Sequence, residues 1–212
     1  MSTDFKLFQD IEFPIKNVHL DLDLDDIFFL KCTQKRVIEV NSEINDTSAQ
    51  LLARAIIQIN QEDKGIPVEE RKPIRVILSS YGGEVDSGFK MIDAMLNSKT
   101  PVWTINIGQQ YSMAAIVGLA GEKRYASKNA SFLLHDGTVT VYDSGSKVHD
   151  YIKFDMALQK RMKDFVTSRT KISAKTYEKK GRDEWYFFAD EAKKIGVIDG
   201  IIGEDIDLED II

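Results

Sequence analysis

The sequence predicts an α/β fold in which helices cover a mainly parallel sheet. Its central part alternates short β-rich apolar runs, typical of strands, with stretches whose apolar residues recur at helical spacing. Such alternation favours a parallel sheet, because parallel strands need crossover connections, which are usually helical. The chain of 212 residues is long enough to bury a substantial core, and its 43% hydrophobic and 29% charged residues are ordinary for a globular protein.

The composition also argues against several classes of protein. The 28 Lys and Arg against 34 Asp and Glu give a net charge of −6, so we expect no nucleic-acid partner. The most apolar run, residues 113–120, is far shorter than the ~20 residues needed to span a bilayer. Residues 1–6 lack the basic and then apolar order of a secretory signal. We therefore expect a cytoplasmic protein with no membrane partner.

The N-terminal third of the chain begins with a segment unlike the rest. Leu and Asp alternate over residues 20–25, which is the pattern of a half-buried strand or an exposed arm, and we expect residues 1–34 to form an N-terminal arm. Residues 36–40 predict the first strand of the domain. A polar cluster at 45–48 offers an N-cap for a helix over 49–60. The apolar residues at helical spacing in that helix are Leu51, Leu52, Ala55, Ile56 and Ile59.

The middle of the chain supplies the strands and helices of the sheet. The predicted strands are residues 74–78, 102–107 and 131–134. After the first of them, a glycine-containing turn leads into a helix. The apolar face predicted for that helix consists of Val85, Phe89, Ile92 and Leu96. After the second strand, residues 112–119 predict a short helix that is almost wholly apolar and therefore buried.

The longest predicted helix covers residues 146–168. At roughly 1.5 Å per residue it would exceed 30 Å, which is more than a domain of this size needs for its own core, so we expect a projecting or intersubunit element. A small helix at 190–194, capped by Gly196, and a strand at 197–198 complete the domain. Residues 204–212 form an acidic tail. Its apolar side chains could dock on a neighbouring subunit if the tail is not simply solvated: Ile206, Leu208, Ile211 and Ile212.

Candidate chemical groups stand where predicted strands end, which is where open α/β sheets build their sites. Gly82 and Gly83 present backbone N–H groups without side-chain obstruction, as an oxyanion cradle requires. Ser112 begins the buried helix, and His135 follows an apolar strand. Taken singly, each has an ordinary structural explanation: a turn, a helix cap and a hydrogen-bonded histidine. Ser112 and His135 nevertheless stand where a nucleophile and a base would be expected.

Several segments resemble one known family. Residues 79–85 (Ser-Ser-Tyr-Gly-Gly-Glu-Val) are similar to the glycine strip of the Clp protease proteolytic subunit (ClpP), and residues 111–115 (Tyr-Ser-Met-Ala-Ala) to its nucleophile segment. Residues 121–135 resemble its Gly-x-Lys-Arg segment that ends in His. Residues 182–199 resemble its Arg-Asp-x-Phe ending with Glu-Ala and Gly-Leu-Val-Asp. The resemblance covers about residues 35–203, with its elements in the family's order and at similar spacing.

The resemblance implies a ClpP/crotonase-like fold of repeated β-β-α units with a projecting handle helix, in which residues 35–203 form a serine peptidase domain and residues 1–34 an axial segment. It also implies a role for each site residue. Ser112 would be the nucleophile, His135 the general base and Asp183 the orienting acid, while the N–H groups of Gly83 and Met113 would bind the oxyanion.

The resemblance implies partners as well. We expect a homo-oligomer of stacked seven-membered rings that cleaves peptides and unfolded proteins, fed by an AAA+ unfoldase. The subunit itself would need no cofactor, and ATP would be used only by the unfoldase. We also expect no metal. Cys32 is the only cysteine, and the aspartates at 21, 23 and 25 lack the Gly and Glu of a calcium loop.

Four departures from the family's pattern leave alternatives open. Tyr81 replaces a proline of the glycine strip, and Gln110 with Tyr111 replaces the small pair before the nucleophile. Asp136 competes with Asp183 as the acid, although a residue adjacent to His135 on a strand points to the opposite face. The stretch before Arg182 is about one residue shorter than in the family, which bears on Asp183.

These departures motivate a catalytically impaired structural or regulatory subunit as one alternative. A phage-type protease that processes a capsid precursor is another. A crotonase-like acyl-CoA enzyme would share the fold without requiring the Ser-His-Asp set.

Overall fold

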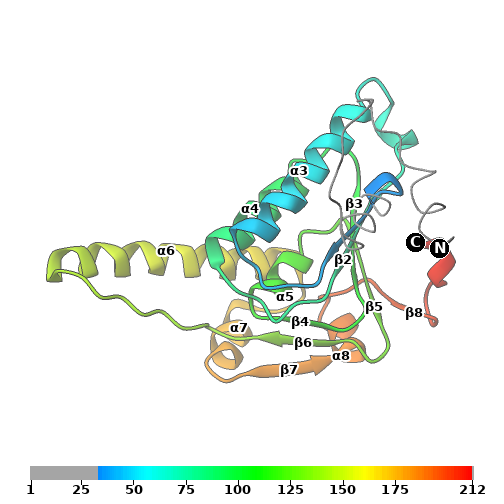
Figure 1. The fold of residues 1–212 in the computed structure, drawn as a ribbon. Helices are drawn as coiled ribbons and strands as arrows, with labels where there is room; N and C mark the ends of the chain where they lie inside the picture. Colours follow the sequence, from blue (N-terminus) through cyan, green and yellow to red (C-terminus); the bar gives the residue numbers. More distant parts are fainter. Residues whose placement is uncertain (1–32, 212) are drawn as a thin grey trace, which may run out of the picture.

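The computed structural model describes residues 33–211, so almost all of the expected arm at 1–34, with Cys32 and the aspartates at 21–25, lies outside the described residues. The described chain contains a five-stranded parallel sheet and a smaller three-stranded sheet (Figure 1). The larger sheet has the order β1 (Val37–Val40), β2 (Ile74–Leu78), β3 (Val102–Asn106), β5 (Lys123–Ser127) and β8 (Gly200–Ile202). The predicted α/β class with a mainly parallel sheet is confirmed.

The smaller sheet lies beside the larger one, and its strands alternate along the chain with strands of the larger sheet. Its order is β4 (Gln109–Tyr111), β6 (Ser131–Leu134) and β7 (Trp185–Phe188). Strands β4 and β6 run parallel, whereas β6 and β7 run antiparallel. These short strands β4 and β7, and β5 in the larger sheet, were not predicted from the sequence.

A β-β-α unit repeats along the chain. After β3, the chain forms β4 in the smaller sheet and then the helix α5 (Met113–Gly118); after β5 it forms β6 and then the long helix α6. In the preceding units the second strand is reduced to isolated parallel bridges, Ile44 with Gly83 and Ser80 with Gln110. The repeat therefore brings the segments around residues 83, 112 and 135 to neighbouring positions in one layer.

Two long helices lie side by side over the larger sheet: α3 (Asp46–Glu62) and α4 (Val85–Leu96) (Figure 1). Helix α3 begins at a reciprocal capping box between Asn45 and Ser48, within the predicted polar cluster. The apolar face predicted for α4 is wrong at Leu96, which is 48% exposed. Gly88 lies on the inward face of α4 instead. A side chain at this position would collide with the side chain of Met113, so the packing requires glycine.

Helix α6 (Gly145–Arg169) projects from the body of the protein, as expected (Figure 1). The chain runs from the end of β6 out to the free end of α6 and returns along the helix. Of the residues of α6, all of which the structure describes, Val166 alone is buried. Large apolar side chains on its outer half are exposed: Tyr151, Ile152, Phe154 and Met156. The unpredicted helix α7 (Ala174–Gly181) packs at its base.

The end of the chain differs from two expectations. The strand predicted at 197–198 is wrong, because the N–H groups of Val197 and Ile198 both donate to the Ala192 carbonyl and close the helix α8 (Ala189–Lys194). The last strand, β8, begins two residues after Ile198. The acidic tail folds back on its own chain, where Ile211 is fully buried with Ile105 and Tyr125.

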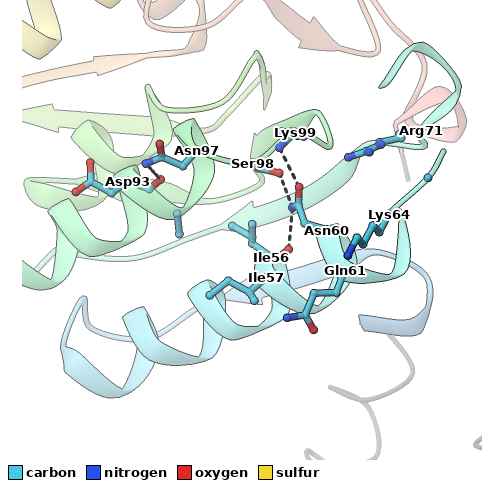
Figure 2. Close-up of a pocket in the computed structure, with 12 residues that line it drawn as sticks. Ile56, Ile57, Asn60, Gln61, Lys64, Arg71, Asp93, Asn97, Ser98 and Lys99 are labelled. Carbon is cyan, nitrogen blue, oxygen red and sulfur yellow. Dashed lines mark hydrogen bonds between the residues drawn. The ribbon is translucent and has the colours of Figure 1, made fainter. Parts of the chain in front are cut away.

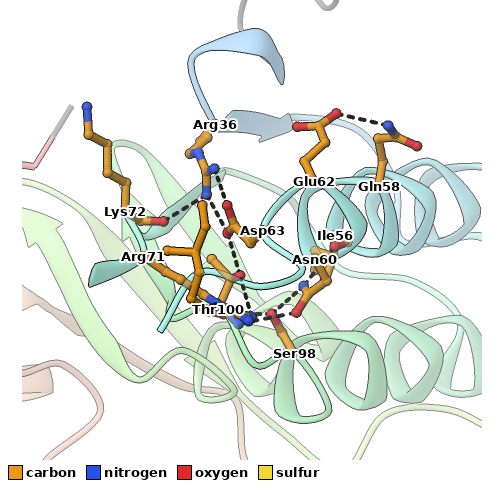
Figure 3. A network of polar contacts seen from close by, with 11 residues as sticks. Arg36, Ile56, Gln58, Asn60, Glu62, Asp63, Arg71, Lys72, Ser98 and Thr100 are labelled. Atoms are coloured by element: carbon orange, nitrogen blue, oxygen red, sulfur yellow. Dashed lines mark hydrogen bonds and ion pairs between the residues drawn. The ribbon is translucent and has the colours of Figure 1, made fainter. Parts of the chain in front are cut away.

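An ion pair joins Asp63, at the end of α3, to Arg36, just before β1 (Figure 3). Asp63, just after α3, accepts two hydrogen bonds from Arg36 at 2.8 and 2.5 Å and one from the Thr100 hydroxyl at 2.7 Å. The Arg36 bond, and to a lesser extent the Thr100 bond, lower the pKa of Asp63 to about 2 despite the opposing effect of burial. No helix within residues 33–211 has the length and apolarity needed to cross a membrane.

Candidate active site

The predicted nucleophile and base meet in the structure. Ser112 Oγ lies 2.7 Å from His135 Nε2, within hydrogen-bond distance. Their backbones are held together by the smaller sheet, in which Tyr111 pairs with Leu133 and the Ser112 N–H donates to the Leu133 carbonyl at 2.9 Å. Each side chain follows the carboxyl end of its strand. The parallel pairing of β4 and β6 therefore brings residues 112 and 135 together.

The backbone of Ser112 has an unusual conformation. Its φ is 53° and its ψ is −127°, and Arg36 is the only other non-glycine residue with positive φ among residues 33–211. Such a conformation costs about 1–3 kcal/mol and concentrates at functional sites. A sharp strand-to-helix turn that exposes a serine hydroxyl is also how α/β-hydrolases present their nucleophile. In this conformation Ser112 Oγ points toward His135 Nε2.

The glycine turn packs directly on the nucleophile segment. A Cβ on Gly82 would lie 2.8 Å from Ser112 Cβ, and a Cβ on Gly83 would lie 2.2 Å from the Ile44 carbonyl oxygen. Both residues also have positive φ, 101° and 148°, which favours glycine. The Gly83 N–H makes no hydrogen bond with another residue of 33–211, and the Met113 N–H, at the first position of α5, has no acceptor within its helix.

Asp183, the predicted acid, is not brought into contact with His135. It lies exposed in the turn between α7 and β7, where its N–H donates to the Lys180 carbonyl at 3.2 Å. Its carboxylate makes no hydrogen bond with His135 or with any other described residue. The role of Asp183 therefore stays a prediction.

Asp136, the competing acid, faces away from the nucleophile. Its N–H donates to the Gly181 carbonyl at 2.8 Å, and its Oδ1 lies where a side chain on Gly181 would be. It thus faces α7, where burial and the nearby Asp136 charge raise the pKa of Tyr177 to about 12.

Tyrosine rings flank the site. The side chain of Gln110 is buried, donates to the Leu78 carbonyl and packs on Gly118, so it does not reach the surface. The ring of Tyr111, by contrast, meets the Tyr81 ring edge-on at a centroid distance of 5.7 Å and the Tyr186 ring at 5.6 Å. Tyr81 and Tyr111 stood out in the sequence as departures. Tyr186 was missed, because its strand was not predicted.

One cavity of the described residues lies apart from the candidate active site. A cavity of about 750 Å³ lies between the C-terminal parts of α3 and α4, where Asn60 bonds Ser98 and the Lys99 backbone (Figure 2). It shares no residue with the pair Ser112 and His135. Residues 33–211 also contain no group of three or more His, Cys, Asp or Glu side chains able to hold a metal ion.

Two comparisons with known proteins identify the family of this chain. The chain is 29% identical over 176 residues to an ATP-dependent Clp protease proteolytic subunit 2 of Bacillus licheniformis, and the match covers 82% of this chain and 90% of that protein. The sequence profile described as Clp protease matches residues 24–205. That match includes both strands of the site, the glycine turn and α6. The chain therefore belongs to the Clp protease family.

Proposed function

We propose that this protein is a serine endopeptidase that cleaves peptides and unfolded proteins. The observation that carries the proposal is the 2.7 Å contact between Ser112 Oγ and His135 Nε2. A serine hydroxyl is a poor nucleophile unless a neighbouring base removes its proton during attack. Membership of the Clp protease family supports the same activity.

The two side chains account for both halves of the reaction. As Ser112 Oγ bonds to the scissile carbonyl carbon, its proton passes to His135 Nε2 and the carbonyl electron pair moves to oxygen. Collapse of the intermediate breaks the C–N bond, and the imidazolium gives its proton to the leaving amine. A water molecule then attacks the acyl-enzyme while His135 takes its proton, and the proton returns to Ser112 as the acid product leaves.

The negative oxygen of the intermediate needs hydrogen-bond donors. The N–H groups of Gly83 and Met113 are suited to this role, since the glycine turn packs against Ser112 and neither group has an acceptor among the described residues. Losing one such donor typically costs about 10²–10³ in kcat. The mechanism requires no metal and no cofactor in the subunit.

We also propose that the subunit acts within a homo-oligomeric chamber, as stacked rings fed by an AAA+ unfoldase. The relative from Bacillus licheniformis is named a proteolytic subunit and ATP-dependent, which implies a larger assembly that uses ATP. The exposed apolar side chains of the projecting helix α6 are suited to contacts between subunits.

The test replaces the nucleophile. Ser112→Ala should lower peptide hydrolysis by about 10⁴-fold or more and abolish labelling by a fluorophosphonate, because no other hydroxyl contacts His135 among the described residues. Ser146→Ala, which changes an exposed serine at the start of α6, is the matched control. Retained hydrolysis in pure Ser112→Ala protein would refute the proposal.

A second candidate function, a structural or regulatory subunit, is favoured by one observation. No carboxylate of residues 33–211 contacts the imidazole of His135. Normal assembly of the pure wild-type protein without covalent labelling by the fluorophosphonate would favour this candidate over the peptidase.

A further inference from the structure

Three tyrosines from three neighbouring segments of chain gather beside the nucleophile: Tyr81, Tyr111 and Tyr186. The ring of Tyr111 lies in the middle and contacts the other two edge-on, at centroid distances of 5.7 Å to Tyr81 and 5.6 Å to Tyr186. Aromatic pairs prefer such edge-to-face contacts. We call these three side chains the tyrosine cluster.

The pairing of the smaller sheet shows on which face the cluster lies. Tyr111 pairs with Leu133 on β6, and Leu133 stands opposite Tyr186 on β7, so the three residues form one row across the sheet. The residues next to this row along the strands, Gln110 and Phe187, are buried, so the row belongs to the open face. Leu133, in the middle of the row, is only 6% exposed, which fits with the two rings meeting over it.

The cluster begins one residue away from the reacting hydroxyl. Tyr111 directly precedes Ser112, and Tyr81 directly precedes Gly82, which packs on the nucleophile: a Cβ on Gly82 would lie 2.8 Å from Ser112 Cβ. One residue advances an extended chain by about 3.3 Å. A peptide whose scissile carbonyl meets Ser112 Oγ therefore has a flanking side chain within reach of these rings.

The cluster presents aromatic surface to solvent in a fixed orientation. Tyr81 is 75% exposed and Tyr186 is 53% exposed. The Tyr111 hydroxyl shares a hydrogen bond with Ser131 Oγ at 2.9 Å, and the Tyr186 hydroxyl donates to Glu184 Oε2 at 3.0 Å. Rings that are already held in place lose little freedom when a ligand binds. Aromatic side chains with a few polar groups around them are typical of the lining of ligand sites.

We infer that the tyrosine cluster is a specificity subsite that receives a large apolar or aromatic side chain of the substrate next to the scissile bond, and this inference rests on the proposed function. Tyr81 and Tyr111 supply the ring surface nearest the nucleophile, and Tyr186 supports Tyr111 from β7. The preferred substrates are then peptides with Phe, Tyr, Leu or Met beside the cleaved bond. Tyr81 and Tyr111 are also two of the residues at which the sequence departs from the family's pattern, so the subsite distinguishes this chain.

The first experiment measures kcat/KM for peptides that differ only in the residues flanking the cleaved bond, which mass spectrometry of the products locates. The wild type should cleave the Phe peptide at least about tenfold faster than the Ala peptide, since an apolar subsite discriminates by about 10-fold to 200-fold. Tyr81→Ala and Tyr111→Ala should each bring this Phe-to-Ala ratio toward 1. Tyr81→Phe keeps the ring and should preserve the ratio.

The matched control is Tyr142→Ala, which removes a fully exposed tyrosine from the segment between β6 and α6. It should leave the Phe-to-Ala ratio unchanged, because Tyr142 makes no ring contact with the tyrosine cluster among the described residues. Size-exclusion chromatography of every variant shows whether a lost ring alters the assembly.

The second experiment measures binding without catalysis. Fluorescein-labelled Phe and Ala peptides are titrated with inactive Ser112→Ala protein, and fluorescence anisotropy gives their dissociation constants. The Phe peptide should bind about tenfold more tightly than the Ala peptide. Adding Tyr81→Ala to Ser112→Ala should remove most of this difference.

The outcomes separate the two proposals. If the wild type cleaves Phe and Ala peptides equally, prefers an Arg peptide, or keeps its ratio in both Tyr81→Ala and Tyr111→Ala, the inference is wrong while the peptidase stands. An altered assembly with an unchanged ratio would assign the rings to contacts between subunits and would also overturn it. If the wild type neither hydrolyses peptides nor reacts with a fluorophosphonate, the proposed function fails. Anisotropy still decides on the tyrosine cluster in that case, since equal affinities for the two peptides overturn the inference.

Discussion

Two polar clusters in this protein differ in how completely their hydrogen bonds are satisfied. At the end of α3, Asp63 is 1% exposed and accepts from both terminal nitrogens of Arg36 and from the Thr100 hydroxyl (Figure 3). At the candidate active site, His135 uses one nitrogen for Ser112, and its other nitrogen bonds no residue of 33–211. Ser112 itself has a strained backbone.

The difference teaches how stability and chemistry are divided in the fold. A buried charge with all its partners present holds three segments of chain together, and removing any partner leaves the rest uncompensated. Hydrogen-bond donors and acceptors of the candidate active site that have no partner among the described residues, in contrast, contribute little to folding but are available to a substrate. Substitutions in the first cluster should therefore change unfolding, and substitutions in the second should change activity.

The largest effect on stability is expected from Asp63→Ala. The variant leaves Arg36 and Thr100 without their shared acceptor, and breaking a buried ion pair from one side costs about 3–5 kcal/mol. Arg36 keeps 22% of its side chain exposed and can regain some hydration, so we expect a loss of about 3 kcal/mol. Urea-induced unfolding of the full chain measures it, and fluorophosphonate labelling of Ser112 should persist under native conditions.

The matched control is the ion pair of Lys160 with Asp164 on α6, whose side chains are 71% and 56% exposed. Asp164→Ala should change the free energy of unfolding by less than about 0.5 kcal/mol, because exposed pairs are screened by water. Equal losses from Asp63→Ala and Asp164→Ala would show that burial does not distinguish the two pairs, which would break the comparison.

A smaller effect should appear in the acid range. The pKa of Asp63 is lowered from its ordinary 3.8 to about 2, chiefly by the hydrogen bond from Arg36, so its ionised form is favoured by folding. Its contribution to stability is complete above its unfolded pKa and declines as the pH falls through its folded pKa. The difference in unfolding free energy between wild type and Asp63→Asn should stay constant above about pH 5 and shrink toward pH 2. A difference that grows on acidification would contradict this assignment.

Most of the fold could be predicted from local patterns. Strands β1, β2, β3 and β6, and helices α3, α4, α5 and α6, follow from apolar runs and helical spacing. The strands that were missed are short or polar. Strand β5, Lys123–Ser127, begins with two cationic residues, and β4, Gln109–Tyr111, has three residues of which two are glutamines. These strands are specified by pairing with neighbours distant in sequence, which no local window contains.

The site could be predicted as far as motifs extend. Ser112, His135 and the glycine turn each stand next to a recognisable strand or helix, and the structure brings them together. The acid is different, because Asp183 matches the motif but its carboxylate makes no hydrogen bond with His135 or any other residue of 33–211, so its role stays a prediction.

A further effect on stability concerns the strained backbone of Ser112. Both Ser112→Gly and Ser112→Ala remove the nucleophile, but only glycine adopts φ of 53° without steric cost. Relief of the strain, about 1–3 kcal/mol, is partly offset by the greater freedom of glycine in the unfolded chain. Ser112→Gly should therefore be more stable than Ser112→Ala by about 1 kcal/mol in urea-induced unfolding. If Ser112→Ala were the more stable variant, the backbone at the nucleophile would not be strained, and the active site would be as relaxed as the Asp63 cluster.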